Sequence, residues 1–231
     1  MKIKILASGS KGNCYLIDDG KNQLLLDAGI PFKTIQSKLN FKTAGIAGVL
    51  ITHRHGDHSL AVNDLLKRGI RVYGNEDMKR FNSGIRTIEP YHTIGITTFD
   101  VTPYPMEHDV ECYGYEIYSY ITGEKLVYIT DTASIPHSFQ GMNYLMVEAN
   151  HDGTILKQNV ANGLVQKHLS KRILESHMEI NHLIEWLMSQ DRNRLLEVYL
   201  LHLSDRNSDE KAFKDIMQML TTACVHCENW Q

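Results

Sequence analysis

The sequence contains no stretch of about 18 apolar residues, the minimum that a membrane-spanning helix requires, so no membrane segment is predicted. It also lacks a recognisable secretory signal, because residues 1–6 are too few and too quickly polar. We expect this opening segment to form the first β-strand. The expected location is therefore the cytoplasm.

An excess of basic charge is missing as well. The formal net charge is −3, with 24 lysines and arginines against 27 aspartates and glutamates. Simple electrostatics therefore does not predict a nucleic-acid-binding protein. Bound divalent cations would change this balance locally, because they would place positive charge where a phosphate group needs it.

Exact repeats, low-complexity stretches and linkers are absent, so residues 1–231 are predicted to form a single domain. Cysteine is scarce, with four residues in all. Two of them form Cys224-Val225-His226-Cys227, which could be half of a zinc site or a redox pair. No second pair stands at zinc-finger spacing, and this favours free thiols.

The pattern of apolar residues predicts strands and helices in both halves of the chain. Strands are expected over residues 2–7, 13–18, 23–27, 48–52, 70–73, 94–103, 113–119, 125–130, 144–148 and 195–203. Helices are expected over residues 31–39, 60–68, 77–81, 155–168, 177–189 and 208–220, the last with Asn207 as its N-cap. This mixture predicts two sheets packed face to face and covered by helices.

The most informative segment is Thr52-His53-Arg54-His55-Gly56-Asp57-His58. Four of its side chains are imidazoles or carboxylates, which are ligands for zinc and also for manganese or iron. The segment follows an apolar strand, so a loop at the strand end can direct alternate side chains inward. A polar loop with incidental histidines is the alternative, and four ligand-type residues at this spacing argue against it.

The segment resembles the His-x-His-x-Asp-His signature of the metallo-β-lactamase superfamily. Further matches occur in the family's order, at Asp27-Ala28-Gly29, His108-Asp109, Asp131 and His202. The resemblance covers nearly the whole chain, and it is strongest to the WalJ/YycJ-like branch, which begins with Ser-Gly-Ser-x-Gly-Asn, here residues 8–13. Residues 148–152 also resemble that branch. The fold implied is of the α/β (α+β) class, an αββα sandwich of two mixed β-sheets flanked by helices.

The resemblance also implies a ligand set for two divalent metal ions. One ion would bind His53, His55 and His108, the other would bind Asp57, His58 and His202, and Asp131 would bridge them. Zinc is the first expectation, with manganese or iron as alternatives. Without metals, His108 would be a loop residue, Asp131 a turn or N-cap residue and His202 a core histidine. Asp27 would orient the metal loop or simply form a turn.

Two metal ions about 3.5–4 Å apart can hold a bridging hydroxide that attacks an electrophilic centre. Asp57 could orient or deprotonate this nucleophile while it binds metal. His151 and His177 are candidates for contacting a substrate phosphate or protonating a leaving group, because Ser176-His177-Met178 is similar to a histidine motif of ribonuclease Z-like members. A solvent-exposed histidine at a helix N-terminus is the alternative for His177.

The leading hypothesis is a metal-dependent phosphodiesterase or nuclease that acts on DNA or RNA. Scattered basic residues could guide a nucleic-acid backbone, namely Lys11, Arg54, Arg206 and Lys211. A second hypothesis is hydrolysis of a small ester, thioester or lactone by the same metals. A third, of a different class, is a metal-stabilised binding module without catalysis, and the complete ligand set argues against it. The oligomeric state stays open.

Overall fold

The computed structural model describes residues 1–227, and the last four residues of the predicted single domain lie outside this range. Two compact units are present. The first comprises Met1–Pro105 and Val110–Glu124, and the second comprises Met106–Asp109 and the chain from Lys125 onward. Within the described residues, no helix has both the length and the apolar character needed to cross a membrane.

The first unit contains a six-stranded mixed sheet. Its strand order is β1 (Lys2–Ala7), β2 (Cys14–Asp18), β3 (Gln23–Leu26), β4 (Ile46–Leu50), β5 (Val72–Gly74) and β6 (Arg86–Thr87). The pairs β1/β2 and β2/β3 are antiparallel, whereas β3 to β6 pair in parallel. The same unit also carries β7 (Ile94–Ile96), β8 (Phe99–Met106) and β9 (Cys112–Ser119).

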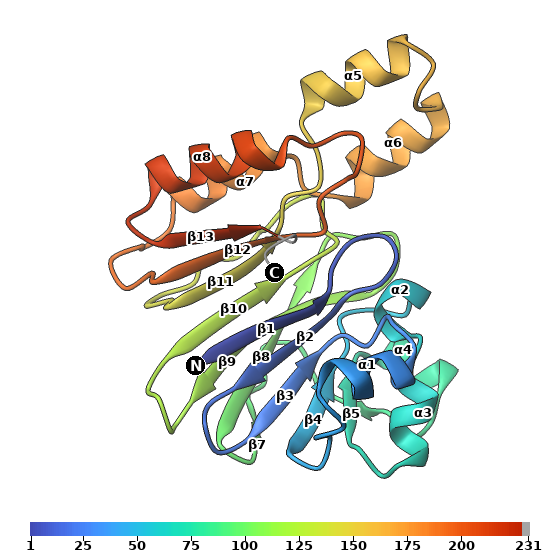
Figure 1. Cartoon of the computed structure of the whole chain (residues 1–231), viewed down its shortest axis with the longest axis vertical. Helices are drawn as coiled ribbons and strands as arrows, with labels where there is room; N and C mark the ends of the chain where they lie inside the picture. The colour runs from blue at the N-terminus through green and yellow to red at the C-terminus, as the bar shows by residue number, and fades with distance from the viewer. Residues whose placement is uncertain (228–231) are drawn as a thin grey trace. The chain divides into compact units, whose positions relative to one another are not determined.

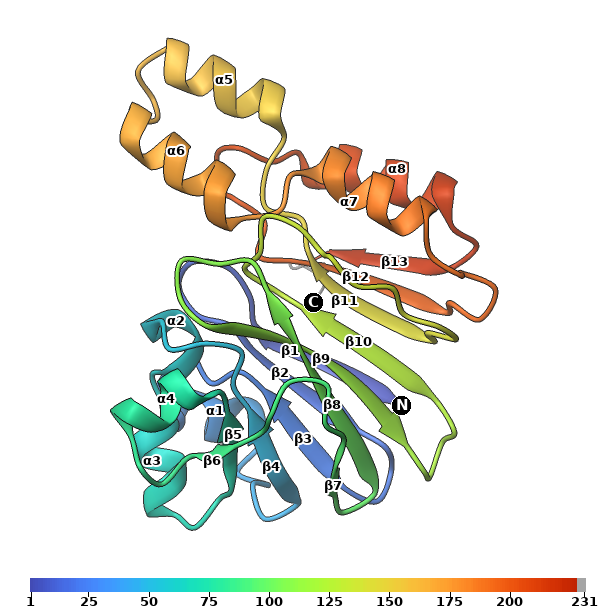
Figure 2. The ribbon, with the colours of Figure 1, turned by 180° about the vertical axis from the view of Figure 1, so that it is seen from behind.

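Four short helices accompany this sheet, and Figures 1 and 2 show them gathered on one side of it. They are α1 (Phe32–Lys38), α2 (Gly56–Ser59), α3 (Val62–Lys67) and α4 (Glu76–Phe81). Apolar side chains from α1, α3 and α4 pack with strand residues into one buried core. The core anchors β3 and β4, and the loops that follow these two strands carry Asp27 and the predicted metal loop.

The second unit is built on four parallel strands in the order β13 (Cys224–Cys227), β12 (Glu197–Leu201), β11 (Tyr144–Glu148) and β10 (Lys125–Ile129). Parallel strands place their carboxyl ends at one edge of a sheet, where ligands usually bind in open α/β structures. Asp131 follows β10, Glu148 ends β11 and His202 follows β12. The predicted site residues of this unit therefore meet at one edge.

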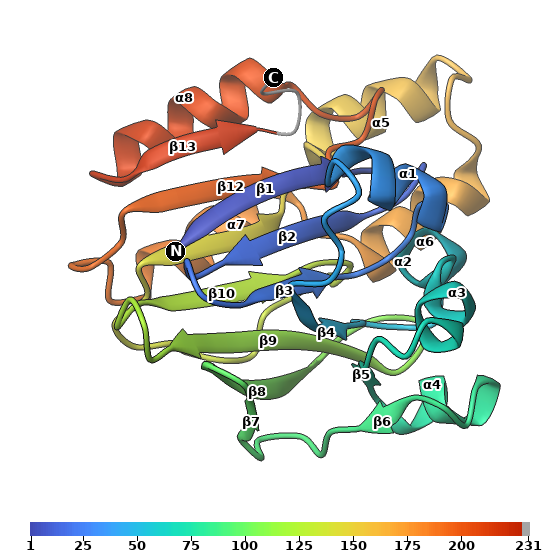
Figure 3. The same ribbon diagram turned by 60° about the horizontal axis from the view of Figure 1, so that its bottom comes forward.

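Helices α7 (Ile180–Met188) and α8 (Glu210–Leu220) lie side by side, as Figures 1 and 2 show, and Figure 3 shows α8 running along β13. Helices α5 (Gly153–Ala161) and α6 (Lys167–Ser176) instead form a hairpin of their own. The single helix predicted over 155–168 is therefore wrong. It ends at Ala161 because Gly163 adopts a left-handed conformation with φ of +72°, and α6 starts after this turn.

The N-cap prediction for the last helix is also wrong by two residues. Asp209, not Asn207, precedes α8, and its side chain accepts a hydrogen bond from the backbone N–H of Ala212. Asn207 is buried instead, with its side chain contacting Asn159 of α5 and Ser204. Both residue types cap helices well, so the sequence alone did not separate them.

Candidate metal centre

The predicted metal loop starts where β4 ends, and Asp27 at the end of β3 holds its first residue. The Oδ1 atom of Asp27 accepts hydrogen bonds from the backbone N–H of Thr52, at 2.8 Å, and from its hydroxyl, at 3.1 Å. Both residues are fully buried. Because β3 and β4 pair in parallel, their carboxyl ends are adjacent, and a carboxylate on one can fix the loop on the other.

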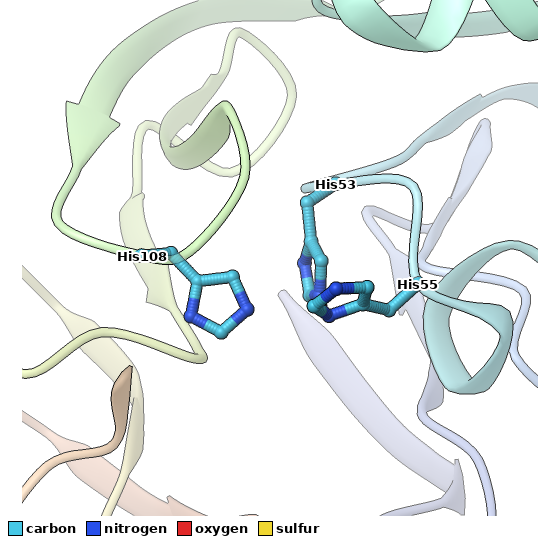
Figure 4. Close-up of side chains that lie close together, drawn as sticks. All are labelled: His53, His55 and His108. Atoms are coloured by element: carbon cyan, nitrogen blue, oxygen red, sulfur yellow. The ribbon is translucent and has the colours of Figure 1, made fainter. Parts of the chain in front are cut away.

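His53 and His55 direct ring nitrogens toward each other. The Nε2 atom of His53 lies 3.0 Å from Nδ1 of His55, and the two rings meet edge to face at 84°. Figure 4 shows these two rings converging from the same loop. Two imidazole nitrogens that share a tetrahedral zinc ion at about 2.0–2.1 Å lie a little over 3 Å apart. The donor pair therefore fits one metal ion. The other nitrogen of His53, Nδ1, lies 3.0 Å from the hydroxyl of Thr52.

His58 is held from both sides. Its Nδ1 atom lies 2.7 Å from Oδ2 of Asp27, and its Nε2 atom lies 3.0 Å from the side-chain amide of Asn13. A carboxylate on Nδ1 fixes the tautomer of a metal-binding histidine and directs Nε2 at the metal. Asp57 is less buried and lies 3.6 Å from the same Nε2 atom. The positioning role predicted for Asp27 is supported by these contacts.

A close approach between two backbone segments explains why the last residue of Asp27-Ala28-Gly29 is a glycine. A Cβ atom on Gly29 would lie only 1.6 Å from the carbonyl oxygen of Asp57. Backbone hydrogen bonds join the same segments, from Ala28 N–H to the carbonyl of His58 at 2.8 Å and from Asn13 N–H to that of Asp57 at 2.7 Å. The metal loop is thus clamped by backbone bonds as well as by the carboxylate of Asp27.

In the second unit, a buried carboxylate organises the other predicted residues. The Oε1 atom of Glu148 lies 2.6 Å from Nδ1 of His177 and 2.9 Å from Nδ1 of His202. His202 Nδ1 also lies 3.2 Å from Oδ1 of Asp131. Asp131, Glu148, His177 and His202 bring their ligand-type atoms within 4.8 Å of one another. The strand ends therefore place two predicted ligands, Asp131 and His202, beside the predicted catalytic residue His177.

The second oxygen of Glu148 is also fully used. Oε2 accepts hydrogen bonds from the backbone N–H groups of Thr132 and Met178, each at 3.1 Å. Burial raises the pKa of this carboxyl group, but the charge and hydrogen bonds of His177 and His202 outweigh the burial, so the net pKa is lowered. Glu148 is therefore a carboxylate at neutral pH, despite its complete burial.

His177 shows the complementary shift. Burial by itself lowers the pKa of the imidazole, but the Glu148 carboxylate and its hydrogen bond raise the pKa by a larger amount. The net pKa therefore lies above the usual value. Its side chain keeps 17% exposure, so the ring reaches the surface of the unit. A partly exposed, carboxylate-bound histidine with a raised pKa can supply a proton.

His108 lies in the same unit as His177, with the two ring centroids 6.0 Å apart. Its Nδ1 atom contacts the carbonyl oxygen of Ser176 at 3.1 Å, and its Nε2 atom lies 3.1 Å from Oδ1 of Asp109. The backbone carbonyl fixes the ring orientation, as it does for many metal-binding histidines. The ring of His108, predicted from sequence as a metal ligand, is thus positioned by the last residue of α6.

Strained backbone marks three of the site residues. Asp27, Asp131 and His202 have positive φ angles of 54°, 48° and 53°, a conformation that residues other than glycine rarely adopt. Each follows the end of a strand, β3, β10 or β12. Such strain costs of order 1–3 kcal/mol per residue and concentrates at functional sites. The three positions fit a site in which side-chain direction matters more than local stability.

Two other predicted candidates are placed elsewhere. His151 is fully buried, and neither ring nitrogen has a hydrogen-bond partner among the described residues. Burial lowers its pKa, so the ring is neutral at pH 7.

Cys224 is exposed and Cys227 buried on β13, and residues three apart on a strand face opposite sides. No disulfide forms among the four cysteines, all of which are described.

Two positioning residues were not assigned a role from sequence. Asn13 and Glu148 stood in segments noted only for their resemblance to one branch of the family. Asn13 contacts His58, which is 45 positions away in the sequence. Glu148 contacts His177 and His202, which are 29 and 54 positions away. The linear pattern of the sequence contains no signal for these contacts. The predicted ligands fall into two sets, with His53, His55, Asp57 and His58 in the first unit and His108, Asp131 and His202 in the second.

Comparisons with known proteins show the family to which the chain belongs. A family model described as a β-lactamase superfamily domain matches residues 22–198. Exodeoxyribonuclease WalJ of Streptococcus pneumoniae serotype 2 (strain D39 / NCTC 7466) is 30% identical, and the match covers 90% of this chain and 83% of that protein. Exodeoxyribonuclease YycJ of Bacillus anthracis is 28% identical, with 95% and 89% covered.

The fold is shared with solved structures as well. The metallo-β-lactamase fold protein YhfI of Bacillus subtilis is similar with a TM-score of 0.70 at 18% identity, covering 97% of this chain and 95% of that one. The chain therefore belongs to the metallo-β-lactamase superfamily. The predicted fold class, with two mixed β-sheets flanked by helices, is confirmed.

Proposed function

We propose that this chain is a metal-dependent nuclease that hydrolyses phosphodiester bonds in DNA. One observation carries the proposal. Four histidines among the predicted ligands have Nδ1 held by a neighbouring group, which makes Nε2 the ligand atom: the partners are Thr52 for His53, Asp27 for His58, Ser176 for His108 and Glu148 for His202. Metal-binding histidines almost always have such a partner, which orients the ring and fixes its tautomer.

The residues fit two divalent metal ions, for which we propose zinc. His53, His55 and His108 would hold one ion, Asp57, His58 and His202 the other, and Asp131 both. Imidazole nitrogen and carboxylate oxygen suit zinc, and they also suit manganese or iron. When bound, such ions make water a stronger nucleophile and neutralise charge that develops on phosphate oxygens.

The chain's own residues would supply positioning and protons. Asp57 keeps part of its surface exposed and would orient the attacking water or accept its proton. Glu148 holds Nδ1 of His177 at 2.6 Å, which leaves Nε2 of that ring to protonate the departing oxygen. The raised pKa of His177 favours the protonated form that this step needs. Asp27 would hold the ring of His58 through its Nδ1 atom.

DNA is the proposed substrate because two relatives, each matched over more than four fifths of its length, are named exodeoxyribonucleases. RNA and small esters, thioesters or lactones are the alternatives that a substrate panel must separate. We further infer that residues 1–231 act as one domain and work in the cytoplasm, where chromosomal DNA would be available to the enzyme.

The test combines metal analysis with a substrate panel. Protein purified without chelator should carry about two ions per chain, and it should cleave single- or double-stranded DNA. Asp57→Ala and His58→Ala should abolish cleavage, whereas Asp64→Ala, an exposed aspartate on α3, should not. Full activity without metal would overturn the mechanism. Hydrolysis of a thioester or lactone but of no nucleic acid would overturn the nuclease assignment.

A further inference from the structure

The α5–α6 hairpin carries a concentration of positive charge that the whole chain does not show. Between Gly153 and Ser176 stand four basic residues, Lys157, Lys167, Lys171 and Arg172, and one acidic residue, Glu175. The segment therefore has a formal charge of +3, in a chain whose net charge is −3. The rest of the chain carries −6, so the charge of the hairpin is opposite in sign to that of the remaining residues.

The basic residues of α6 share one exposed face. Lys167, Lys171 and Arg172 are all exposed, with His168 beside them, and positions i, i+1, i+4 and i+5 fall on one side of a helix. Their charges are only weakly paired. Lys171 lies 3.6 Å from Glu175, and Arg172 lies 3.6 Å from Asp109, each pair largely exposed. Exposed pairs of this kind contribute little and leave the lysines available to phosphate.

A further base stands beside α5, the other helix of the hairpin. The side-chain amide of Asn159 on α5 donates a hydrogen bond to the backbone carbonyl of Arg206, at 2.8 Å, so the exposed Arg206 stands beside α5. Two of the other bases that sequence patterns suggested as guides lie outside the hairpin and have acidic partners of their own. Arg54 pairs with Asp77 at 2.8 Å, and Lys211 pairs with Asp215 at 2.7 Å.

The basic face leads directly to the proposed proton donor. Helix α6 ends at Ser176, and His177 is its C-cap. Arg172 precedes His177 by five residues, which is roughly 7.5 Å of helix. A chain of phosphates that follows α6 toward its C-terminus would therefore arrive at His177. In Figures 1 and 2 the hairpin stands apart from the strands of its own unit, so its outer face is accessible.

We propose that the α5–α6 hairpin is a backbone-binding arm, which holds the phosphates of duplex DNA next to the scissile bond. The arm recognises charge and spacing and not base sequence, because its side chains are flexible ammonium and guanidinium groups. This inference rests on the proposed nuclease function and adds to it the surface that binds the substrate backbone. It also explains how a chain with net negative charge can bind a polyanion.

The test is the salt dependence of DNA binding. The arm variant combines Lys157→Gln, Lys167→Gln and Lys171→Gln, which are exposed helix positions. The control variant combines Lys33→Gln, Lys67→Gln and Lys79→Gln, exposed helix positions in the other unit that produce the same change in net charge. Binding of a fluorescein-labelled DNA duplex is followed by anisotropy in the presence of chelator, from 50 to 200 mM salt.

The slope of log K against log salt is negative, and each lost phosphate contact makes it less steep by about 0.9 on duplex DNA. We expect the slope to be less steep by about 2 to 3 in the arm variant and to stay at the wild-type value in the control. Hydrolysis of bis(p-nitrophenyl) phosphate by the metal-loaded proteins should be equal in all three, because this small diester does not reach the arm.

The possible results separate the two proposals. A wild type that cleaves DNA, combined with an unchanged slope in the arm variant, would overturn the arm alone. Equal losses in the arm and control variants would also overturn it, because net charge would then be the cause. A wild type that hydrolyses the small diester but neither binds nor cleaves nucleic acid would overturn the nuclease function and the arm together.

Discussion

The Nδ1 atom of His58 lies 2.7 Å from Oδ2 of Asp27, and both side chains are completely buried. The same carboxylate accepts the backbone N–H of Thr52, so it fixes both the start of the metal loop and one of its ligands. A carboxylate in this place requires the proton of His58 to sit on Nδ1. The lone pair on Nε2 then accepts the Asn13 amide, 3.0 Å away, and a metal ion bound to Nε2 would replace that hydrogen bond.

Asp27→Asn should weaken metal binding while it preserves the shape of the site. The amide oxygen can still accept the Thr52 N–H, but the amide NH₂ would donate to Nδ1 of His58 and shift the ring proton to Nε2. We expect affinity for the ion at His58 to fall about 10- to 100-fold, measured by competition with a fluorescent chelator. Asp64→Asn, on the exposed surface of α3, should leave the affinity unchanged. Equal affinities in both variants would contradict the role of Asp27.

Glu148 and His177 should behave as one catalytic unit. Glu148→Gln and His177→Ala should each lower kcat on DNA about 10²- to 10⁴-fold, with a smaller effect on KM, because proton donation to the leaving oxygen is lost. The double variant should lose little more, since residues that act together are not additive. The exposed Glu185→Gln on α7 serves as the control.

Leaving-group dependence separates a catalytic from a structural role for this pair. A p-nitrophenyl leaving group departs without protonation, so its hydrolysis should be affected far less than that of DNA. If both substrates slow equally, Glu148 only maintains the fold around His202, to which it also binds.

The metal loop was predictable because its chemistry is local. His53, His55, Asp57 and His58 are close in sequence, and the preceding apolar strand shows which end of the sheet they occupy. Asp131 and His202 were predictable in the same way, since each follows a strand. Resemblance to a known family supplied the assignment of these residues to two ions, because spacing alone does not pair distant strand ends.

The hydrogen-bonding partners of these ligands were not predictable. Asn13 and Glu148 contact histidines far away in the sequence, and those contacts depend on which strands become neighbours. The break between α5 and α6 was missed for a different reason. A single glycine in a polar stretch does not by itself indicate the end of a helix, because helices tolerate isolated glycines. Only the left-handed φ of Gly163 shows that the helix ends there.

Gly29→Ala should destabilise the first unit and disturb the metal loop. The added methyl group would stand 1.6 Å from the carbonyl oxygen of Asp57, which is backbone and cannot rotate away. We expect a loss of about 2 kcal/mol or more in the free energy of unfolding, measured by urea denaturation. Gly56→Ala, in the metal loop itself, is the control, because a Cβ there meets no atom within 4 Å. A Gly29→Ala protein as stable as the control would show that the two segments separate easily.

Asp19 should make the stability of the first unit depend on pH. Its carboxylate accepts the backbone N–H groups of Lys21 and Asn22 and the hydroxyls of Thr98 and Ser119. Burial raises the pKa of this group, but these hydrogen bonds outweigh the burial, so its folded pKa lies below the usual value. The contribution is therefore complete above the unfolded pKa of about 3.9 and is lost as pH falls through the folded pKa.

Asp19→Asn should cost about 1–3 kcal/mol at pH 7, because the amide cannot accept all four hydrogen bonds. The difference between wild type and variant should stay constant from pH 7 to about pH 5 and shrink below about pH 4, as the wild-type carboxylate is protonated. Urea denaturation at a series of pH values measures it, with the exposed Asp205→Asn as the control. A difference that grows toward acid pH would mean that the folded pKa of Asp19 is raised, and the hydrogen bonds would then not dominate over burial.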